Sequence, residues 1–400
     1  MRREAGFAMN VVLAKTETGH ALGDIFAIAR DRLPGATEIA DARQQAFEAY
    51  ERAGLPHRRI EDWKYTDLRV LMRDVLPLAA APDAAALKRA AAALKLHAIE
   101  GARRLVLVDG VFAPKLSEMA GLEKGLSIRT LREMLEAGDT SLHAQLYAPD
   151  NSDPMVALNS AMMTDGLVIE VADGAVLTQP LHIVHIASGA APSAMFTRSL
   201  LRVGKNAKAT LVESYIAADG AKAYQVHDSL VVSIGDGARL DHVRLIEDGR
   251  EAFNISSAVL RLGAHAHFNT FGMTSGASVS RYQAVIAFAG EGSRVETNGV
   301  NLLNGRQHAD STLLLSDEAE ADNKPELEIF ADDVTCGHGA TTGALDESLL
   351  FYLRARGLSE KEAQALLIQA FVGEAIESIV NDGLRELAIS AAQRWLEARG

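Results

Sequence analysis

The sequence predicts a mainly β chain with helical ends, whose core is a parallel β-helix. From about Leu167 the apolar pattern changes from a helical period to a period of two, with runs such as LVIEV, LHIVHI and SLLRV. Turn pieces of small residues (ADGA, KNAK, GDGA, GAHA and GEGS) separate these runs. Aromatic residues make up only 5% of the chain while Ala and Gly abound, a composition that suits tightly stacked coils.

The turn pieces recur at a nearly constant distance along the chain. Their equivalent positions are Ala175, Ala207, Ala238, Ala266 and Ser293, so that successive pieces lie about 30 residues apart. Such regular spacing is typical of a solenoid or a sandwich. We expect each repeat to hold two rungs of a few short strands. An antiparallel β-sandwich remains open as the alternative.

The chain divides into three predicted domains. Residues 1–155 form an N-terminal helical domain with a small β-hairpin, residues 156–343 the parallel β-helix, and residues 344–400 a C-terminal helical domain. In the first domain, the helical segments are expected at 21–33, 39–53, 87–96, 131–137 and 141–147. Asp109-Gly110 between two apolar runs predicts the hairpin.

Helix signals return after Gly343. Asp346 is a predicted N-cap, Ser359 and Glu362 form a capping box for the next helix, and Gly383 is expected to end that helix. The last helix is expected to carry one apolar face, made of Leu384, Leu387, Ala388, Ala391 and Trp395. The middle helix has a predicted apolar stripe at Ala363, Leu366, Leu367, Ala370, Phe371, Ile376 and Ile379, and Glu374 within this stripe is interpreted as a partner contact or an edge position.

Composition excludes several classes of function. The formal net charge of −13 argues against nucleic acid or an anionic membrane surface as a partner. No apolar run is long enough to cross a bilayer, so no membrane span is expected. A single cysteine and the poor match of the first residues to a signal peptide favour the reducing cytoplasm. Neither a phosphate-binding glycine loop nor a G-x-S-x-G nucleophile elbow occurs.

The candidate metal ligands are Cys336 and His338, near the change from strand to helix. Residues at i and i+2 on a strand point to the same face, so thiol and imidazole would form a donor pair for a thiophilic metal. Two donors are only half of a coordination sphere, and the other half is expected from another chain. A buried, inert cysteine is the alternative.

Two other histidine pairs are interpreted as structural. His265 and His267 are expected at the surface of a β-turn, since no third ligand follows at a suitable spacing. His182 and His185 are separated by an odd number of positions, which places them on opposite faces of a strand.

Three segments resemble the SufB/SufD family of paired scaffold proteins for iron–sulfur cluster assembly. They are GLPHRRIEDWKYTDLR, LVLVDGVFAPKLS and, most specifically, DDVTCGHGATTGALDESLLFYLRARGLSEKEAQALLIQAF. The resemblance spans nearly the whole chain, and the single cysteine is typical of the SufD branch. It implies a right-handed parallel β-helix between the two helical domains.

The resemblance also implies partners and a site. The chain would pair with a SufB-like subunit through the ends of the two β-helices, and a SufC-like ABC-type ATPase would bind its C-terminal helices. Candidate residues for ATPase docking are Asp346, Phe351, Leu366, Leu367, Phe371 and Glu374. A transient iron–sulfur cluster or iron, shared with SufB, would use His338 and Cys336, and this chain alone would hold no permanent cofactor.

The expected function is therefore a non-enzymatic scaffold subunit. Two alternatives belong to other classes. A β-helix carbohydrate enzyme would need carboxylates that converge on a groove. A structural homodimer would pair through the β-helix edge.

Overall fold

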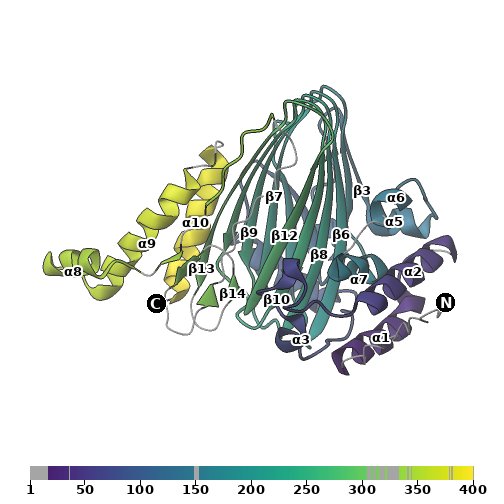
Figure 1. The fold of residues 1–400 in the computed structure, drawn as a ribbon, viewed down its shortest axis with the longest axis horizontal. Helices are drawn as coiled ribbons and strands as arrows, with labels where there is room; N and C mark the ends of the chain where they lie inside the picture. The colour runs from purple at the N-terminus through teal and green to yellow at the C-terminus, as the bar shows by residue number, and fades with distance from the viewer. Residues whose placement is uncertain are drawn as a thin grey trace, which may run out of the picture.

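The middle of the chain is a parallel β-solenoid with helices at both ends, as predicted (Figure 1). This computed structural model describes residues 17–35, 37–147, 153–303, 308–309, 312–314, 320–321, 333–339, 342–343, 345–377, 379 and 382–399. Within them, two sheets face each other, one in the strand order β17-β15-β13-β11-β9-β7-β5-β1-β2 and the other in the order β16-β14-β12-β10-β8-β6-β4-β3.

The strands of the solenoid alternate between the two sheets along the chain. They are β4 (Leu167–Val171), β5 (Leu181–Ala187), β6 (Ser193–Val203), β7 (Lys208–Ala217), β8 (Tyr224–Ile234), β9 (Arg239–Glu247), β10 (Phe253–Leu262), β11 (His267–Thr274), β12 (Val279–Phe288), β13 (Arg294–Leu303), β14 (His308–Ala309), β15 (Thr312–Leu314), β16 (Glu320–Ala321) and β17 (Thr342–Gly343).

The register between successive coils reproduces the predicted spacing. Val176, Lys208, Arg239, His267 and Arg294 lie side by side in neighbouring coils, and the steps between them match the steps between the turn pieces. The prediction of two rungs in each repeat was wrong, because one repeat is a single coil of two long strands, such as β6 and β7. Long strands bury more apolar surface per turn than the short rungs expected.

The turns that follow the strands of the β6–β8 sheet form a narrow edge, at which the two sheets converge (Figure 1). Ala207, Ala238 and Ala266 stack there and are fully buried. Each turn also has one residue with positive φ at the same place: Gly174, Asn206, Gly237, His265 and Gly292. Glycine and asparagine adopt this left-handed conformation more easily than other residues, which explains the composition of the turn pieces.

The N-terminal region adds helices and three strands. These elements are α1 (Glu17–Ala29), α2 (Thr37–Ala53), α3 (Leu68–Leu71), α4 (Ala84–Leu94), β1 (Arg103–Val108), β2 (Val111–Phe112), β3 (Leu126–Thr130), α5 (Leu131–Glu136), α6 (His143–Leu146) and α7 (Pro154–Met162). Asp109 and Gly110 both have positive φ and close the predicted hairpin between β1 and β2. β1 and β3 each extend one sheet of the solenoid, so the domain boundary at residue 155 stays a prediction.

Helices cover the outer faces of both sheets. α1, α3 and α7 pack against β6, β10 and β12 through one apolar cluster, and α4 covers β1, β5 and β7. At the other end, α9 and α10 pack on β7, β9, β11 and β13. The sheets are therefore buried on both faces over most of their area, as parallel sheets require.

The C-terminal helices are α8 (Glu347–Ala355), α9 (Glu360–Ile376) and α10 (Asp382–Arg399). The predicted N-cap at Asp346 and the capping box of Ser359 and Glu362 are confirmed. Gly383 was wrongly expected to end a helix, since it lies in the first turn of α10. The buried face of α10 includes Leu384, Leu387, Ala388 and Ala391, as predicted.

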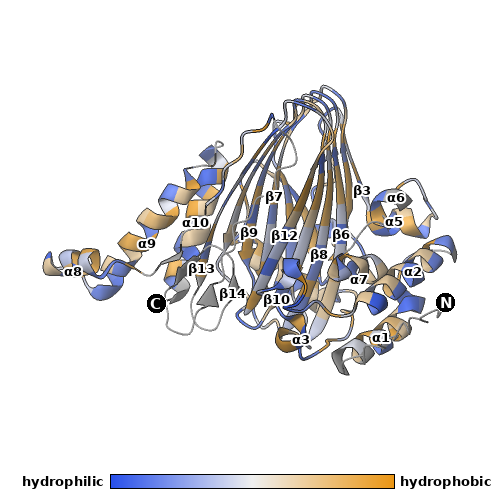
Figure 2. Cartoon of the chain, in the orientation of Figure 1, coloured by the Kyte–Doolittle hydropathy of each residue, from blue (hydrophilic) through white to orange (hydrophobic). Residues whose placement is uncertain are grey.

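The apolar stripe predicted for α9 was partly wrong. The buried residues of this helix are Ala363, Ile368, Val372 and Ile376, whereas Leu366 is 46% exposed. Apolar residues surround much of α9 (Figure 2), so periodicity alone selects no single face. The contact with the sheet decides which face is buried.

We expect Gly166→Ala to lower the free energy of unfolding by about 3 kcal/mol or more. A Cβ at Gly166 would lie 1.7 Å from the carbonyl oxygen of Arg198 in the next coil, so backbone must move. Gly272→Ala is the matched control, because a Cβ there meets nothing within 4 Å, and its effect should stay below about 1 kcal/mol. Urea unfolding of both variants measures the difference, and equal stabilities would contradict the packing described.

We expect the protein to lose stability as the pH falls below about 6.5, partly through His227. Burial lowers the pKa of His227 to about 3, so between these values only the unfolded chain takes up the proton. Protonation of His227 in the unfolded chain should lower the free energy of unfolding by about 2 kcal/mol between pH 7.5 and 5. Because His227 stacks on Phe196 at 4.5 Å, His227→Phe should flatten the pH dependence measured by urea unfolding. The control variant His267→Gln, at an exposed histidine, should leave the pH dependence of stability unchanged. If the parent and both variants lost stability equally as the pH falls, the assignment to His227 would be refuted.

Candidate functional site

Cys336 and His338 are both exposed, in the stretch 333–339 between β16 and β17. These strands form the C-terminal edges of the two sheets, so the stretch belongs to the last coil of the solenoid. The expectation of a strand was wrong, because residues 334–339 have no regular secondary structure. The argument that strand geometry turns both side chains to one face therefore does not apply.

The surroundings of His338 are open. Among the residues that the structure describes, no atom lies within 4 Å of a Cβ added at Gly337 or Gly339, on either side of His338. Thiolate sulfur and imidazole nitrogen are the donor types that iron and iron–sulfur clusters accept from proteins. No group of three metal-binding side chains in the described residues includes either one. The pair thus offers two accessible donors and leaves the other positions of a metal or cluster free.

The other predicted partner residues lie on α8 and α9. Asp346 caps α8 by accepting hydrogen bonds from the backbone of Ser348 and Leu349, and the side chain of Phe351 is 75% exposed. Leu366 is exposed, Leu367 half-buried and Glu374 exposed, while Phe371 packs against the apolar cluster under α9. With Leu349 and Tyr352, also exposed, Phe351 makes α8 an apolar surface at one end of the molecule (Figure 2).

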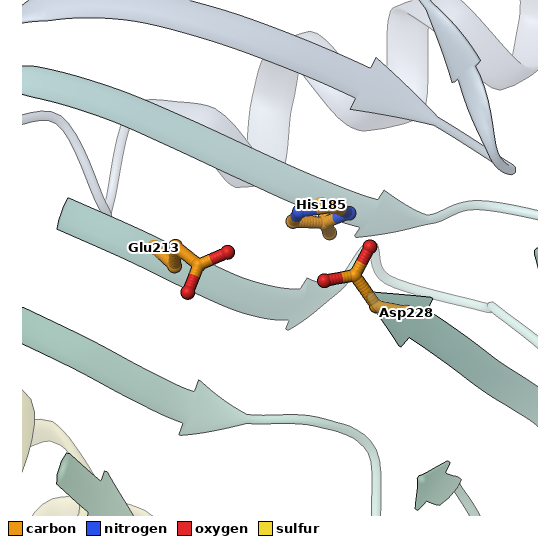
Figure 3. A group of neighbouring side chains, drawn as sticks. All are labelled: His185, Glu213 and Asp228. Atoms are coloured by element: carbon orange, nitrogen blue, oxygen red, sulfur yellow. The ribbon is translucent and has the colours of Figure 1, made fainter. Parts of the chain in front are cut away.

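A second group of metal-binding side chains lies inside the solenoid. His185 of β5, Glu213 of β7 and Asp228 of β8 point toward one another, and one donor atom from each lies within 4.8 Å of the others (Figure 3). All three side chains are buried. β5 and β7 belong to one sheet and β8 to the other, so the group bridges the two sheets away from their narrow edge.

Hydrogen bonds fix the two carboxylates of this group. The hydroxyl of Tyr215 donates to Asp228 at 2.8 Å and to Glu213 at 3.4 Å, and the hydroxyl of Thr197 also donates to Asp228. His242 Nε2 lies 2.9 Å from Glu213 Oε2. Burial raises the pKa of Tyr215, so its phenol keeps the proton that it donates.

Two buried guanidinium groups lie near the carboxylates, that of Arg244 beside Glu213 and that of Arg198 near Asp228. The guanidinium of Arg244 is 3.9 Å from Glu213 and stacks on the rings of Tyr215 and Tyr282, at 4.5 and 4.4 Å. Burial alone would favour the neutral form of Glu213. The hydrogen bond with His242 and the charge of Arg244 outweigh this effect and lower the pKa of Glu213, so its carboxylate is ionised at neutral pH.

The histidine assignments from sequence hold in part. His182 hydrogen-bonds Ser214 on the outer face of its sheet, while His185 stacks on Tyr215 inside the solenoid, so the two face opposite sides as predicted. The sequence analysis did not find the group around His185. The available signal was Glu213, a charged residue at an inward position of the apolar run ATLVESYI, where period-two patterning places a core side chain.

The chain matches two family models over most of its length. The model described as "SUF system FeS cluster assembly, SufBD core domain" matches residues 185–313 and 309–371. The model described as "SufBD protein N-terminal region" matches residues 24–183. No helix within the described residues is long and apolar enough to cross a membrane.

Curated relatives agree with the family models. The iron–sulfur cluster assembly protein SufD of Escherichia coli is 27% identical over 88% of this chain and 92% of its own length. A SufBD family protein of Synechocystis is 27% identical over 85% of this chain and 87% of its own. SufD of Bacillus subtilis is 29% identical over 40% of this chain and 35% of its own. With both family models matched, the chain belongs to the SufBD family of iron–sulfur cluster assembly proteins.

Proposed function

We propose that this chain is a SufD-type, non-enzymatic subunit of a cytoplasmic scaffold complex. It pairs with a SufB-type chain and binds a SufC-type ATPase. The relatives in Escherichia coli and Bacillus subtilis that bear the name SufD support this assignment to a branch of the family. Glu213 and Asp228, the carboxylates of the group around His185, are buried inside the solenoid, so they do not form the open groove that a carbohydrate enzyme needs.

The observation that carries the proposal is the exposed pair Cys336 and His338 in the last coil. In the proposed complex, the partner's end coil faces this one and supplies the missing ligands. The cluster is then cargo, formed between two chains and passed on, and neither chain holds it permanently. Two donors from one chain bind iron weakly, since a stable site needs about four, which favours release.

The ATPase docks, in this proposal, on the apolar surface of α8 and the exposed side of α9. Aromatic residues in the centre of an interface carry much of its binding energy, and Phe351 is the most exposed large apolar residue described. Ile368 and Val372 on the opposite side of α9 belong to the apolar cluster that includes Val300 and Leu302 of β13. Movement of the helices would therefore act directly on the last coils of the solenoid.

We predict that His338→Ala abolishes most cluster formation but leaves folding and partner binding intact, because the exposed side chain supports no packing. The test is co-expression with the SufB-type and SufC-type chains, followed by iron and sulfide analysis and the visible spectrum of the purified complex. His267→Ala, which removes an exposed histidine elsewhere in the solenoid, should retain a full cluster. An unchanged iron content in the His338→Ala complex would overturn the assignment.

Replacement of the neighbouring thiol separates its role from that of His338. If Cys336 donates to iron, Cys336→Ser lowers cluster content, because a serine hydroxyl is a poor ligand for iron at neutral pH. Full cluster content in this variant, together with loss in His338→Ala, would leave the imidazole as the single ligand from this chain.

We predict that Phe351→Asp weakens binding of the SufC-type ATPase at least about 30-fold, as loss of an interface hot spot of about 2 kcal/mol implies. Isothermal titration of the ATPase against this chain measures the affinity. Ile28→Asp is the control, because Ile28 is 68% exposed on α1 at the opposite end of the molecule. Equal affinities of the Phe351→Asp variant and the parent would show that α8 is not the docking surface.

A further inference from the structure

The group of His185, Glu213 and Asp228 has the donor types of a site for a divalent transition metal. One imidazole and two carboxylates are ligands that zinc, iron(II) and manganese(II) share. The group is buried and bridges β5, β7 and β8, far along the chain from the exposed pair at 336 and 338. It is independent of the proposed scaffold function, since it needs no partner chain.

The imidazole of His185 is the unexplained member of this group. It stacks on Tyr215 at 4.5 Å, but its ring nitrogens make no hydrogen bond to any residue that the structure describes. A ring nitrogen of His185 is therefore available to a ligand near the two carboxylates. His185 also lines a small cavity with Thr197, Tyr215 and Asp248, with room for about one water-sized particle, although Glu213 and Asp228 do not line it.

Buried cations already lie near the two carboxylates. The guanidinium of Arg244 is 3.9 Å from Glu213, and the buried guanidinium of Arg198 interacts electrostatically with Asp228. Opposite charges and hydrogen bonds of this kind allow carboxylates to stay buried. The case for a metal ion therefore depends on the donor types and their geometry.

The spacing of the donor atoms is close to that of a metal site. A point equidistant from three atoms 4.8 Å apart lies about 2.8 Å from each, whereas zinc–ligand distances are about 2.0 to 2.2 Å. Each side chain must therefore move inward by less than about 1 Å, which small side-chain rotations supply. Tyr215, Thr197 and His242 already hold the two carboxylates by hydrogen bonds, as groups around metal ligands do.

We propose that His185, Glu213 and Asp228 bind one divalent transition-metal ion inside the solenoid. The ion takes its three protein ligands from three successive coils and from both sheets, and it cross-links the sheets away from their narrow edge. We expect the ion to have a structural role, since protein encloses it and it lies apart from the exposed donors of the last coil.

The test uses the full chain in a Cys336→Ser/His338→Ala background, which removes the exposed donor pair. The protein is refolded with Co²⁺, so that a closed interior cannot prevent entry, and is then desalted. We expect one tightly held Co²⁺ per chain, with visible d–d absorption of a nitrogen- and oxygen-ligated ion, displaced by refolding with Zn²⁺. The midpoint of thermal unfolding should rise with bound metal.

His185→Phe keeps the stacking on Tyr215 but removes both ring nitrogens, and it should lower retained Co²⁺ at least about 10-fold. His182→Phe is the matched control, since His182 lies on the same strand and faces the other side, and it should retain the ion. If His185→Phe does not fold, the nearly isosteric Asp228→Asn gives the same comparison. No Co²⁺ or Zn²⁺ retained by the refolded parent, or equal retention by His185→Phe, overturns the proposal.

Discussion

The parallel register between successive coils is the constraint on which the rest of this structure depends. Each coil repeats the strands and turns of its predecessor, so the register decides whether a side chain points into the solenoid or out of it. At the narrow edge this register stacks Ala207, Ala238 and Ala266. Where the sheets splay, the same register brings Glu213 and Arg244 to neighbouring positions and creates a polar interior.

Much of the fold could be predicted from local signals in the sequence. The turn spacing, the Asp109-Gly110 hairpin and the capping box at Ser359 depend on a few adjacent residues, and the structure confirms all three. The failures concern tertiary contacts. Apolar residues surround α9, so only the sheet beneath it decides that Ile368 is buried and Leu366 exposed.

The sites differ in how far the sequence reveals them. Cys336 and His338 are near neighbours in the chain, so a motif could identify them, but their conformation could not be predicted, because no strand forms there. His185, Glu213 and Asp228 lie on three different strands, and only the coil register brings them together. The period-two pattern could have predicted that the charged side chain of Glu213 points into the solenoid. It could not have predicted that His185 and Asp228 lie beside it. The chain thus has an exposed Cys–His pair, for which we propose a transient cluster, and an enclosed group, for which we propose a resident ion.

The central claim is that an imidazole of this chain takes part in binding a cluster that a second chain completes. The most direct measurement is pulsed electron paramagnetic resonance of the reduced, cluster-loaded complex, with ¹⁵N-histidine incorporated into this chain alone. Direct ligation predicts a strong ¹⁵N hyperfine coupling that is absent when only the partner chains carry the label. A cluster without ¹⁵N coupling from this chain would contradict the account.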